Sequence, residues 1–326
     1  MESQSTIQNN KTTGTKKPQC PFCGKDNLRL ITNQVRFGKK ADVYQCLGCE
    51  LTFLDQGSFH FPKDFYEQDY HQTYLTHVEP DALNPQVYFE KMKKTTQPWA
   101  DKLAKSLTGK EIVLDIGCST GHFMDLIKDK VGQVYGCELN KKEIEFCQKV
   151  LKFDVSDEPL EKRFKEGMFD YITLIYVLEH IGEPKEFLNS IKRFLKPSGK
   201  IIILVPNIQD ALVNFYQIPE FQNFYYCIEH LYYYNPKTIK NLLDQVGLAG
   251  TIEVVQEYPI TNHLNWGYRR APSDTLAARR GVPDIALLPQ SPEEAWQQLW
   301  QKFNAMYREF LKTNGYGDRV WCSVGK

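Results

Sequence analysis

A short apolar run that ends in an acid and leads into a glycine-rich turn constrains the fold of this chain more than any other feature. Ile112–Ile116 has the length of a buried strand and carries Asp115 near its end. Gly117–Gly121 follows, and His122–Ile127 then has helical spacing. Glycines let the backbone of such a turn approach a ligand, and open α/β sheets bind ligands beyond the carboxyl ends of their strands. The sequence therefore predicts a strand, a turn and a helix with a ligand site at the turn.

A second acid-tipped strand is expected about twenty residues later. Gln133–Glu138 has strand character, and a carboxylate at its end can accept hydrogen bonds from both hydroxyls of a ribose. The glycine-rich turn is Asp-x-Gly-Cys-Ser-Thr-Gly, which matches neither the GxGxxG of dinucleotide-binding proteins nor the Walker P-loop. The two acids indicate a nucleoside ligand that also carries a cationic group.

These residues resemble the class I S-adenosylmethionine-dependent methyltransferases. Two further segments match in order, Phe169–His180 as the fourth strand with its loop and Leu195–Asn207 as a turn with the fifth strand. The resemblance covers about residues 98–326. It implies an α/β fold with a Rossmann-like sheet of seven mostly parallel strands, the last of them antiparallel.

The resemblance also implies where S-adenosylmethionine binds. The turn would approach its methionine end with support from Asp115, and Glu138 would bind the ribose. An acid after the third strand would meet the adenine amine, and Asp157 and Asp154 are alternatives for that role. The expected cofactor-binding residues are Asp115, Gly117, Cys118, Gly121, Glu138, Asp157 and Tyr176.

A long insertion separates the last two expected strands, Thr251–Glu257 and Asp318–Val324. We expect residues 258–317 to form a lid, since an insertion of this length is usually functional. Its helix, at about residues 292–313, has an aromatic face that we expect to pack as core. That face consists of Trp296, Trp300, Phe303, Tyr307 and Phe310. Two arginine doublets, Arg269–Arg270 and Arg279–Arg280, suit phosphate groups of an acceptor, with a solvated loop as the alternative.

Two Cys-x-x-Cys pairs near the N-terminus predict a structural metal site. They are Cys20 with Cys23 and Cys46 with Cys49, and the strand-like residues between them predict a hairpin that brings the pairs together. Four thiolates in a tetrahedron suit zinc, although the spacing does not separate zinc from iron. We expect residues 18–56 to form this ribbon and the metal to serve as a folding staple. The alternative role for the ribbon is to bind nucleic acid.

Composition argues against several classes of protein. Lys+Arg and Asp+Glu both number 40, so the chain has no overall attraction for nucleic acid. No apolar run reaches 18 residues, so we expect no membrane span. The other five of the nine cysteines are scattered, which favours reduced thiols and a cytoplasmic protein. We expect residues 1–17 to be a disordered leader and residues 57–97 to form a linker or helical cover.

Two Glu-His pairs are candidates for activating an acceptor. Glu179–His180 ends the fourth-strand motif, and Glu229–His230 lies in the segment after the fifth strand. Methyl transfer to oxygen needs a base, and imidazole has a suitable pKa. We expect His230 to be the base, with Glu229 beside it and His180 as the second candidate. The alternative is that each pair only orders its loop.

The segment Phe224–Pro236 resembles a subset of the family, the zinc-ribbon methyltransferases of bacterial surface-glycan and deoxysugar pathways. This implies a small acceptor such as a sugar, a nucleotide-sugar or a surface-glycan precursor, with or without phosphate, and an active site covered by Tyr66 and Tyr70. Sugar C-methyltransferases of the subset carry a further C-terminal domain that this sequence does not show. We therefore expect O-methylation, with sugar C-methylation and RNA modification through the ribbon as alternatives.

Overall fold

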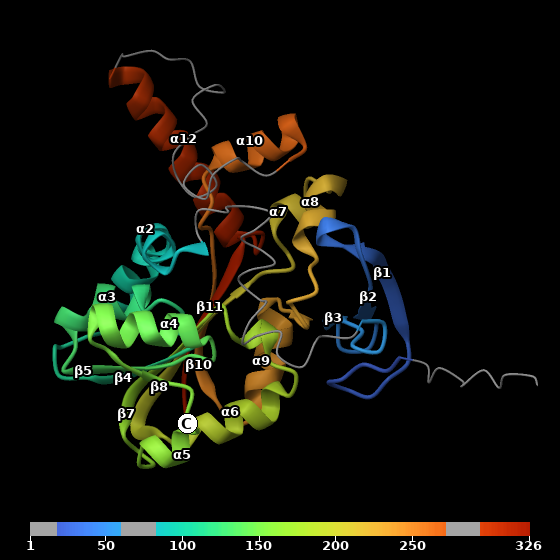
Figure 1. Cartoon of the computed structure of the whole chain (residues 1–326). Helices are drawn as coiled ribbons and strands as arrows, with labels where there is room; N and C mark the ends of the chain where they lie inside the picture. The colour runs from blue at the N-terminus through green and yellow to red at the C-terminus, as the bar shows by residue number, and fades with distance from the viewer. Residues whose placement is uncertain (1–17, 60–82, 272–293) are drawn as a thin grey trace, which may run out of the picture.

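The computed structural model describes residues 18–59, 83–271 and 294–326. The expected leader, Tyr66, Tyr70 and the doublet Arg279–Arg280 lie outside these ranges, as does the side chain of Trp296. A central sheet is covered by helices on both faces, and the N-terminal segment forms a smaller sheet at one side (Figure 1).

The central sheet has seven strands in the order β10-β11-β8-β7-β4-β5-β6. β4 to β8 run parallel, while β11 is antiparallel to both of its neighbours. The strands are β4 (Ile112–Ile116), β5 (Gln133–Cys137), β6 (Asp154–Ser156), β7 (Phe169–Ile175), β8 (Leu195–Pro206), β10 (Ala249–Val255) and β11 (Arg319–Gly325). The predicted α/β fold, with seven mostly parallel strands and an antiparallel last strand, is confirmed.

One boundary differs from the sequence prediction. The segment Leu195–Gly199, expected as a turn, already belongs to β8. Leu195 pairs with Phe169, and the next pair, Lys200 with Tyr171, comes only after a shift of register. The extra residues form a bulge, and Gly199 is needed there because a Cβ atom would lie 2.7 Å from the carbonyl oxygen of Phe169.

Helices cover the two faces of the sheet. One face carries α2 (Pro85–Ala104), α3 (His122–Ile127) and α4 (Lys141–Phe146), and the other carries α5 (Leu160–Arg163), α6 (Pro184–Lys192) and α9 (Pro236–Gln245) (Figure 1). The connections contain the 3-10 turns η4 (Lys128–Lys130) and η6 (Leu178–His180), the π-turn η5 (Cys147–Leu151), and the short helices α7 (Ala211–Asn214) and α8 (Pro219–Tyr225).

Helix α2 extends across residues 97 and 98, where the sequence placed the start of the methyltransferase domain. The side chain of Asn84 caps it by accepting hydrogen bonds from the backbone N–H groups of Gln86 and Val87. Trp99 is buried and stacks on Trp321 of β11 with ring centroids 5.9 Å apart. The helix therefore packs into the core of the α/β domain, which agrees with the helical cover that was one of the two expectations for residues 57–97.

The N-terminal cysteine ribbon (residues 18–56) joins the rest of the molecule through a shared sheet. Its elements are β1 (Leu28–Val35), η1 (Arg36–Gly38), β2 (Lys39–Cys46) and β3 (Thr52–Leu54). β3 pairs antiparallel with β9 (Tyr232–Tyr233), a strand that comes after β8 in the sequence. Leu54 and Tyr233 are buried in one continuous hydrophobic core, so packing holds the ribbon against the rest of the molecule.

The insertion before β11 contributes α10 (Ile260–Arg269) and α12 (Glu294–Thr313). The predicted helix is present, but core packing was the wrong expectation for Phe303 and Phe310, which are each 51% exposed. Only the face with Tyr307 and Leu311 turns inward, and Tyr307 contacts the ring of His263 on α10. The exposed face has too few described neighbours to bury those rings.

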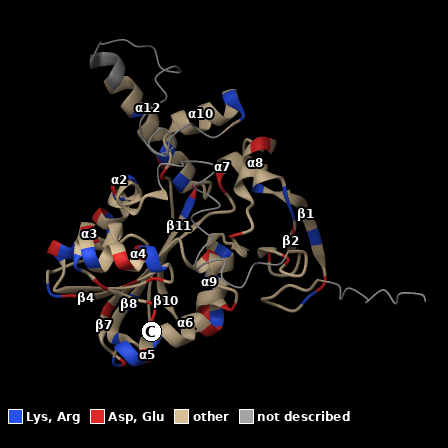
Figure 2. Ribbon diagram, in the orientation of Figure 1, with Lys and Arg blue, Asp and Glu red and all other residues tan. Residues whose placement is uncertain are grey.

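Charges of both signs are mixed along the helices and the ribbon (Figure 2). Lys240 pairs with Asp244 along α9, for example, and Lys237 pairs with Glu50 of the ribbon. Within the described ranges, no helix is both long and apolar enough to cross a membrane.

Candidate active site

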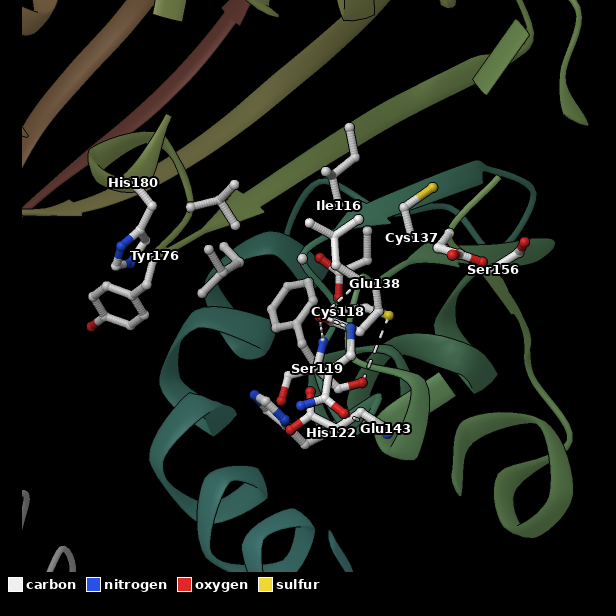
Figure 3. A pocket seen from close by; sticks show the side chains of 18 of the residues that line it. Ile116, Cys118, Ser119, His122, Cys137, Glu138, Glu143, Ser156, Tyr176 and His180 are labelled. Carbon is white, nitrogen blue, oxygen red and sulfur yellow. Dashed lines mark hydrogen bonds between the residues drawn. The ribbon is translucent and has the colours of Figure 1, made fainter. Parts of the chain in front are cut away.

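A cavity of about 460 Å³, here called the first cavity, opens at the carboxyl ends of β4, β5 and β6 (Figure 3). Its volume is in the range of small-molecule sites. The glycine-rich turn after β4 forms one wall, and the loop after β7 forms another. Tyr88 and Met92 of α2 also line it, which shows why this helix belongs to the domain.

The glycine-rich turn needs its glycines for steric reasons. Gly117 has a φ of +70°, and a Cβ atom there would lie 2.6 Å from Cγ2 of Val177. Gly121 has a φ of +73°, also in the left-handed region. The backbone N–H groups of Gly117 and Cys118 donate to the carbonyl oxygen of Cys137, at 2.8 and 3.1 Å. The turn is thereby fixed to the end of β5.

Gly136 completes this packing, and the sequence analysis did not single it out. A Cβ atom at this position would lie 2.7 Å from Sγ of Cys118, 2.8 Å from Cγ2 of Val155 and 2.9 Å from Sδ of Met124. A glycine inside a strand pattern often marks such a close approach. That signal was present in the segment 133–138.

Glu138 lies at the end of β5 on the wall of the first cavity. Its Oε2 accepts a hydrogen bond from the backbone N–H of Ser119 at 2.8 Å, which is drawn in Figure 3. Its Oε1 accepts from the N–H groups of Leu139 and Asn140, at 2.7 and 2.9 Å. These three bonds hold the carboxylate in a fixed position beside the turn.

Asp115 is 2% exposed and lies in the floor of the first cavity. Its Oδ1 accepts a hydrogen bond from the hydroxyl of Thr173 at 2.6 Å. Burial raises the pKa of Asp115 to about 7. A cation bound nearby would lower this pKa again, so the site favours a ligand with a positively charged group.

The structure separates the two acids that the sequence left as alternatives for adenine. Asp157 lines the first cavity and is ion-paired with Lys141. Asp154 instead pairs with Arg163, at 2.8 Å, and is not part of the cavity wall. Asp157 is therefore the acid that can reach a ligand. Cys118 also lines the cavity, as a buried thiol.

Tyr176 lies in the loop after β7 with a φ of +59°, a strained value for a residue with a side chain. Its hydroxyl donates to Oε2 of Glu257 at 3.0 Å and accepts from Nε of Arg319 at 2.7 Å. Arg319 is also ion-paired with Glu257 at 3.1 Å. This buried network fixes the Tyr176 ring at the edge of the first cavity.

The two Glu-His pairs lie together, although 49 residues separate them. Nδ1 of His180 donates to the backbone carbonyl oxygen of Glu229 at 2.7 Å. The rings of His180 and His230 meet edge to face, with centroids 4.9 Å apart. The carboxylic side chains of Glu179 and Glu229 are both buried. Burial lowers the pKa of His230 well below its usual value, so its imidazole is neutral at pH 7.

A second cavity, of about 110 Å³, lies on the other side of this histidine pair. His180 lines the first cavity and His230 the second. Similarly, Tyr176 lines the first and its partner Arg319 the second. The two cavities are thus neighbours, separated by two pairs of side chains in contact.

The second cavity combines aromatic rings with buried polar groups that come from distant parts of the chain. Trp266 of α10 and Asp210, the cap of α7, both line it. So does Arg36 of the ribbon, whose Nε donates to the carbonyl oxygen of Phe224 at 2.7 Å. No local motif marks these residues, which is why the sequence analysis missed them. The doublet Arg269–Arg270 lines neither cavity.

The four ribbon cysteines form a cluster with all sulfur atoms within 4.8 Å of one another. Two of the Sγ–Sγ distances, Cys20 to Cys49 and Cys23 to Cys46, are 3.5 Å. A tetrahedral site with Zn–S bonds of about 2.3 Å requires sulfur atoms about 3.8 Å apart. The donor set and its spacing therefore fit a four-thiolate metal site.

Comparisons with known proteins agree with this architecture. Residues 88–253, half of the chain, match a family model described as a methyltransferase domain. An uncharacterised protein of Methanocaldococcus jannaschii is 36% identical over 108 residues, which are 31% of this chain and 43% of the relative. A ubiquinone biosynthesis O-methyltransferase of Dechloromonas aromatica is 32% identical over 117 residues, 33% of this chain and 49% of the relative. The chain thus spans about half the length of these curated relatives.

Among solved structures, a SAM-dependent methyltransferase from Archaeoglobus fulgidus aligns with this chain. It has 20% sequence identity and a TM-score of 0.47, and the match covers 72% of this chain and 94% of that chain.

Proposed function

Because this chain belongs to the methyltransferase-domain family, we propose that it transfers a methyl group from S-adenosylmethionine to a hydroxyl group of a small polar acceptor. One observation carries the proposal. The first cavity places a glycine turn between a fixed carboxylate, Glu138, and a buried acid, Asp115. This arrangement suits a ligand with a ribose at one end and positive charge at the other.

The residues of the first cavity fit this cofactor at both ends. S-adenosylmethionine supplies a methyl group bound to a positively charged sulfur, and the sulfur becomes a neutral thioether when the methyl group is transferred. Glu138 accepts hydrogen bonds from the ribose hydroxyls, and Asp157, which lines the same cavity, accepts one from the adenine amine. Asp115 and the turn from Gly117 through Cys118 to Gly121 serve the amino-acid end, and the Tyr176 ring covers the cavity edge.

The acceptor is activated at the pair of histidines between the two cavities. His230 is neutral and has its ring at the second cavity, so it can take the proton from a hydroxyl held there. Glu229 fixes His180 through its backbone carbonyl, and His180 is the second candidate base. The four ribbon cysteines hold zinc, which stabilises the strand that pairs with β9.

Two candidate acceptors are supported, a sugar hydroxyl and a phenol-type hydroxyl. The likeness of residues 224–236 to sugar methyltransferases favours a sugar hydroxyl, and Asp210 with the two arginines that line the second cavity suits such a ring. The relatives include a ubiquinone biosynthesis O-methyltransferase, so a phenol-type hydroxyl is the second candidate.

A methyl-transfer assay with the full chain tests this function. We would supply cofactor with a labelled methyl group and two sets of acceptors, nucleotide-sugars and substituted catechols. We expect label in the sugar set. His230→Ala should lower turnover by about 10²–10⁴-fold, the usual contribution of a general base, with cofactor affinity unchanged. His263→Ala is the matched control, because His263 is a buried histidine outside both cavities. Equal turnover in the His230 and His263 variants would refute the base assignment.

A further inference from the structure

Glu179 is an anomaly in the buried wall between the two cavities. Its side chain is 1% exposed, yet neither carboxylate oxygen has a hydrogen-bond partner among the described residues. Burying a carboxylate without a partner is costly, and buried acids are normally paired or coordinate a metal. The position therefore calls for a ligand that the protein itself does not provide.

Two imidazoles supply the rest of a ligand set beside this carboxylate. One ligand atom each of Glu179, His180 and His230 lies within 4.8 Å of the other two. Bonds of about 2.1 Å to a common ion require ligand atoms about 3 Å apart, so modest side-chain rotations would close the site. Two histidines and one carboxylate on one side of an ion leave its other positions open.

The hydrogen bonding of His180 is that of a metal ligand. The carbonyl oxygen of Glu229 can only accept, so Nδ1 of His180 carries the proton in their 2.7 Å bond. Its Nε2 then presents a lone pair. Metal-binding histidines typically donate their other N–H to a carbonyl or carboxylate in this way. For His230, no hydrogen bond to either ring nitrogen is found within the described ranges, and its ring borders the second cavity.

We propose that Glu179, His180 and His230 bind a divalent transition-metal cation between the first and second cavities. The nitrogen and oxygen ligands suit Mn²⁺, Fe²⁺, Co²⁺, Ni²⁺ or Zn²⁺, whereas the four thiolates of the ribbon select softer ions. Because His180 borders one cavity and His230 the other, the ion faces both the cofactor and the acceptor.

This inference rests on the proposed function and changes how the acceptor is activated. A hydroxyl bound to the cation becomes more acidic, as water does on zinc, and gives its proton to solvent water. The oxygen then forms a bond to the methyl carbon while the carbon–sulfur bond breaks and its electron pair goes to sulfur. With the cation present, His230 acts as a ligand and does not have to take the proton.

Binding of Mn²⁺ to the full chain tests the site directly, with zinc first supplied at one equivalent per chain so that the four softer ribbon thiolates take it and the nitrogen and oxygen ligands stay empty. Electron paramagnetic resonance of free Mn²⁺ should show one bound ion per chain. Glu179→Gln preserves the shape of the side chain and removes its negative charge, whereas His230→Gln removes the imidazole ligand. Each substitution should therefore weaken Mn²⁺ binding at least tenfold. Glu253→Gln, at a side chain 42% exposed on β10, is the matched control and should bind as the parent does. Equal Mn²⁺ affinity in all four proteins, or no binding by the parent, would overturn the proposal.

Methyl transfer with and without Mn²⁺ separates this inference from the proposed function. Turnover that falls on chelation and returns with Mn²⁺, in the parent but not in Glu179→Gln, supports the site. Turnover that is indifferent to chelation refutes the cation and leaves the methyltransferase with its imidazole base. Stoichiometric Mn²⁺ binding without methyl transfer to either acceptor set supports the site and counts against the proposed function.

Discussion

At the scale of single residues, the Glu138 carboxylate is expected both to fix the local backbone and to bind the cofactor. Three backbone N–H groups hold its carboxylate, and the same carboxylate is expected to bind the ribose. Glu138→Ala should weaken binding of S-adenosylhomocysteine by about 10–100-fold, because hydrogen bonds to a charged group contribute about 1.5–3 kcal/mol. Calorimetry measures this directly. Asp154→Ala, at an acid outside the cavity, should change the affinity less than twofold; a similar loss in both variants would contradict the assignment.

Asp210 provides a pH-dependent prediction. Burial, together with the negative charge of Asp318, raises the pKa of Asp210 to about 7. In the unfolded chain its pKa is about 3.9, so between pH 4 and 7 the folded state binds more protons than the unfolded state. The contribution of Asp210 to stability therefore falls as the pH rises through this window and stays low above it.

Asp210→Asn should remove this loss. The amide oxygen still caps α7 by accepting from the backbone N–H of Leu212, as Oδ1 now does at 2.7 Å. We expect the variant to be more stable than the parent at pH 8, by up to about 4 kcal/mol. Near pH 4 we expect little difference. Urea unfolding at both pH values measures the change, and an equal effect at the two values would show that the Asp210 pKa is not raised.

Single residues also mark the limit of the sequence analysis. Asp115 and Glu138 could be located because acids at strand ends follow a recognisable spacing. Asp157 could be chosen over Asp154 only in the structure, since the direction of each side chain depends on its ion pair with Lys141 or Arg163. Arg319 was not predicted because it borders the second cavity through tertiary contacts alone.

At the scale of elements, the close packing of β5 on the glycine turn leads to a stability prediction. Gly136→Ala would place a Cβ atom against Cys118, Val155 and Met124. Overpacking of this kind costs about 1–3 kcal/mol, and a displaced turn should also weaken cofactor binding. Gly267→Ala is the control, because no atom lies within 4 Å of its would-be Cβ and it lies inside α10.

Because position 267 is open and lies inside α10, Gly267→Ala should stabilise the protein by about 0.5–1 kcal/mol. Chemical unfolding of both variants, with cofactor affinity measured alongside, gives the comparison. If Gly136→Ala proved as stable as the parent, the steric account of the turn would fail.

The elements themselves were largely predictable. β4 and the α12 helix follow from apolar runs and helical spacing, and the number of strands and the antiparallel last strand follow from the family resemblance. Residues 57–97 were expected to form a linker or helical cover, with the family resemblance beginning at about residue 98; α2 runs across that point, and its buried Trp99 and Leu103 hold it on the sheet. The exposure of Phe303 and Phe310 depends on which face of α12 meets α10, and periodicity alone does not decide that.

At the scale of the whole molecule, the cysteine ribbon is built into the acceptor side of the site. β3 pairs with β9, and the N–H of Leu54 donates to the carbonyl oxygen of Leu231, the residue after His230. Arg36 of the ribbon borders the second cavity. The sequence predicted the four cysteines but not this contact, because the pairing of residues 52–53 with 232–233 leaves no local signal.

Removal of the ribbon metal should therefore damage the acceptor site more than the cofactor site. Cys23→Ser is suitable, because Cys23 is exposed and the change creates no cavity. We expect loss of zinc, and amide hydrogen exchange at β9 at least tenfold faster, which corresponds to about 1.4 kcal/mol. Exchange in β5, which pairs with β4 and β6 in the central sheet, should change little.

In the same variant, the KM for the acceptor should rise several-fold while the affinity for S-adenosylhomocysteine stays within a factor of two. The reason is geometric, because β9 follows His230 directly, whereas Glu138 and the glycine turn are fixed by β4 and β5. A metal that served only as a staple for a separate ribbon would leave both constants unchanged. If cofactor affinity fell as far as acceptor affinity, the ribbon would instead support the whole domain, and its special link to the acceptor side would be refuted.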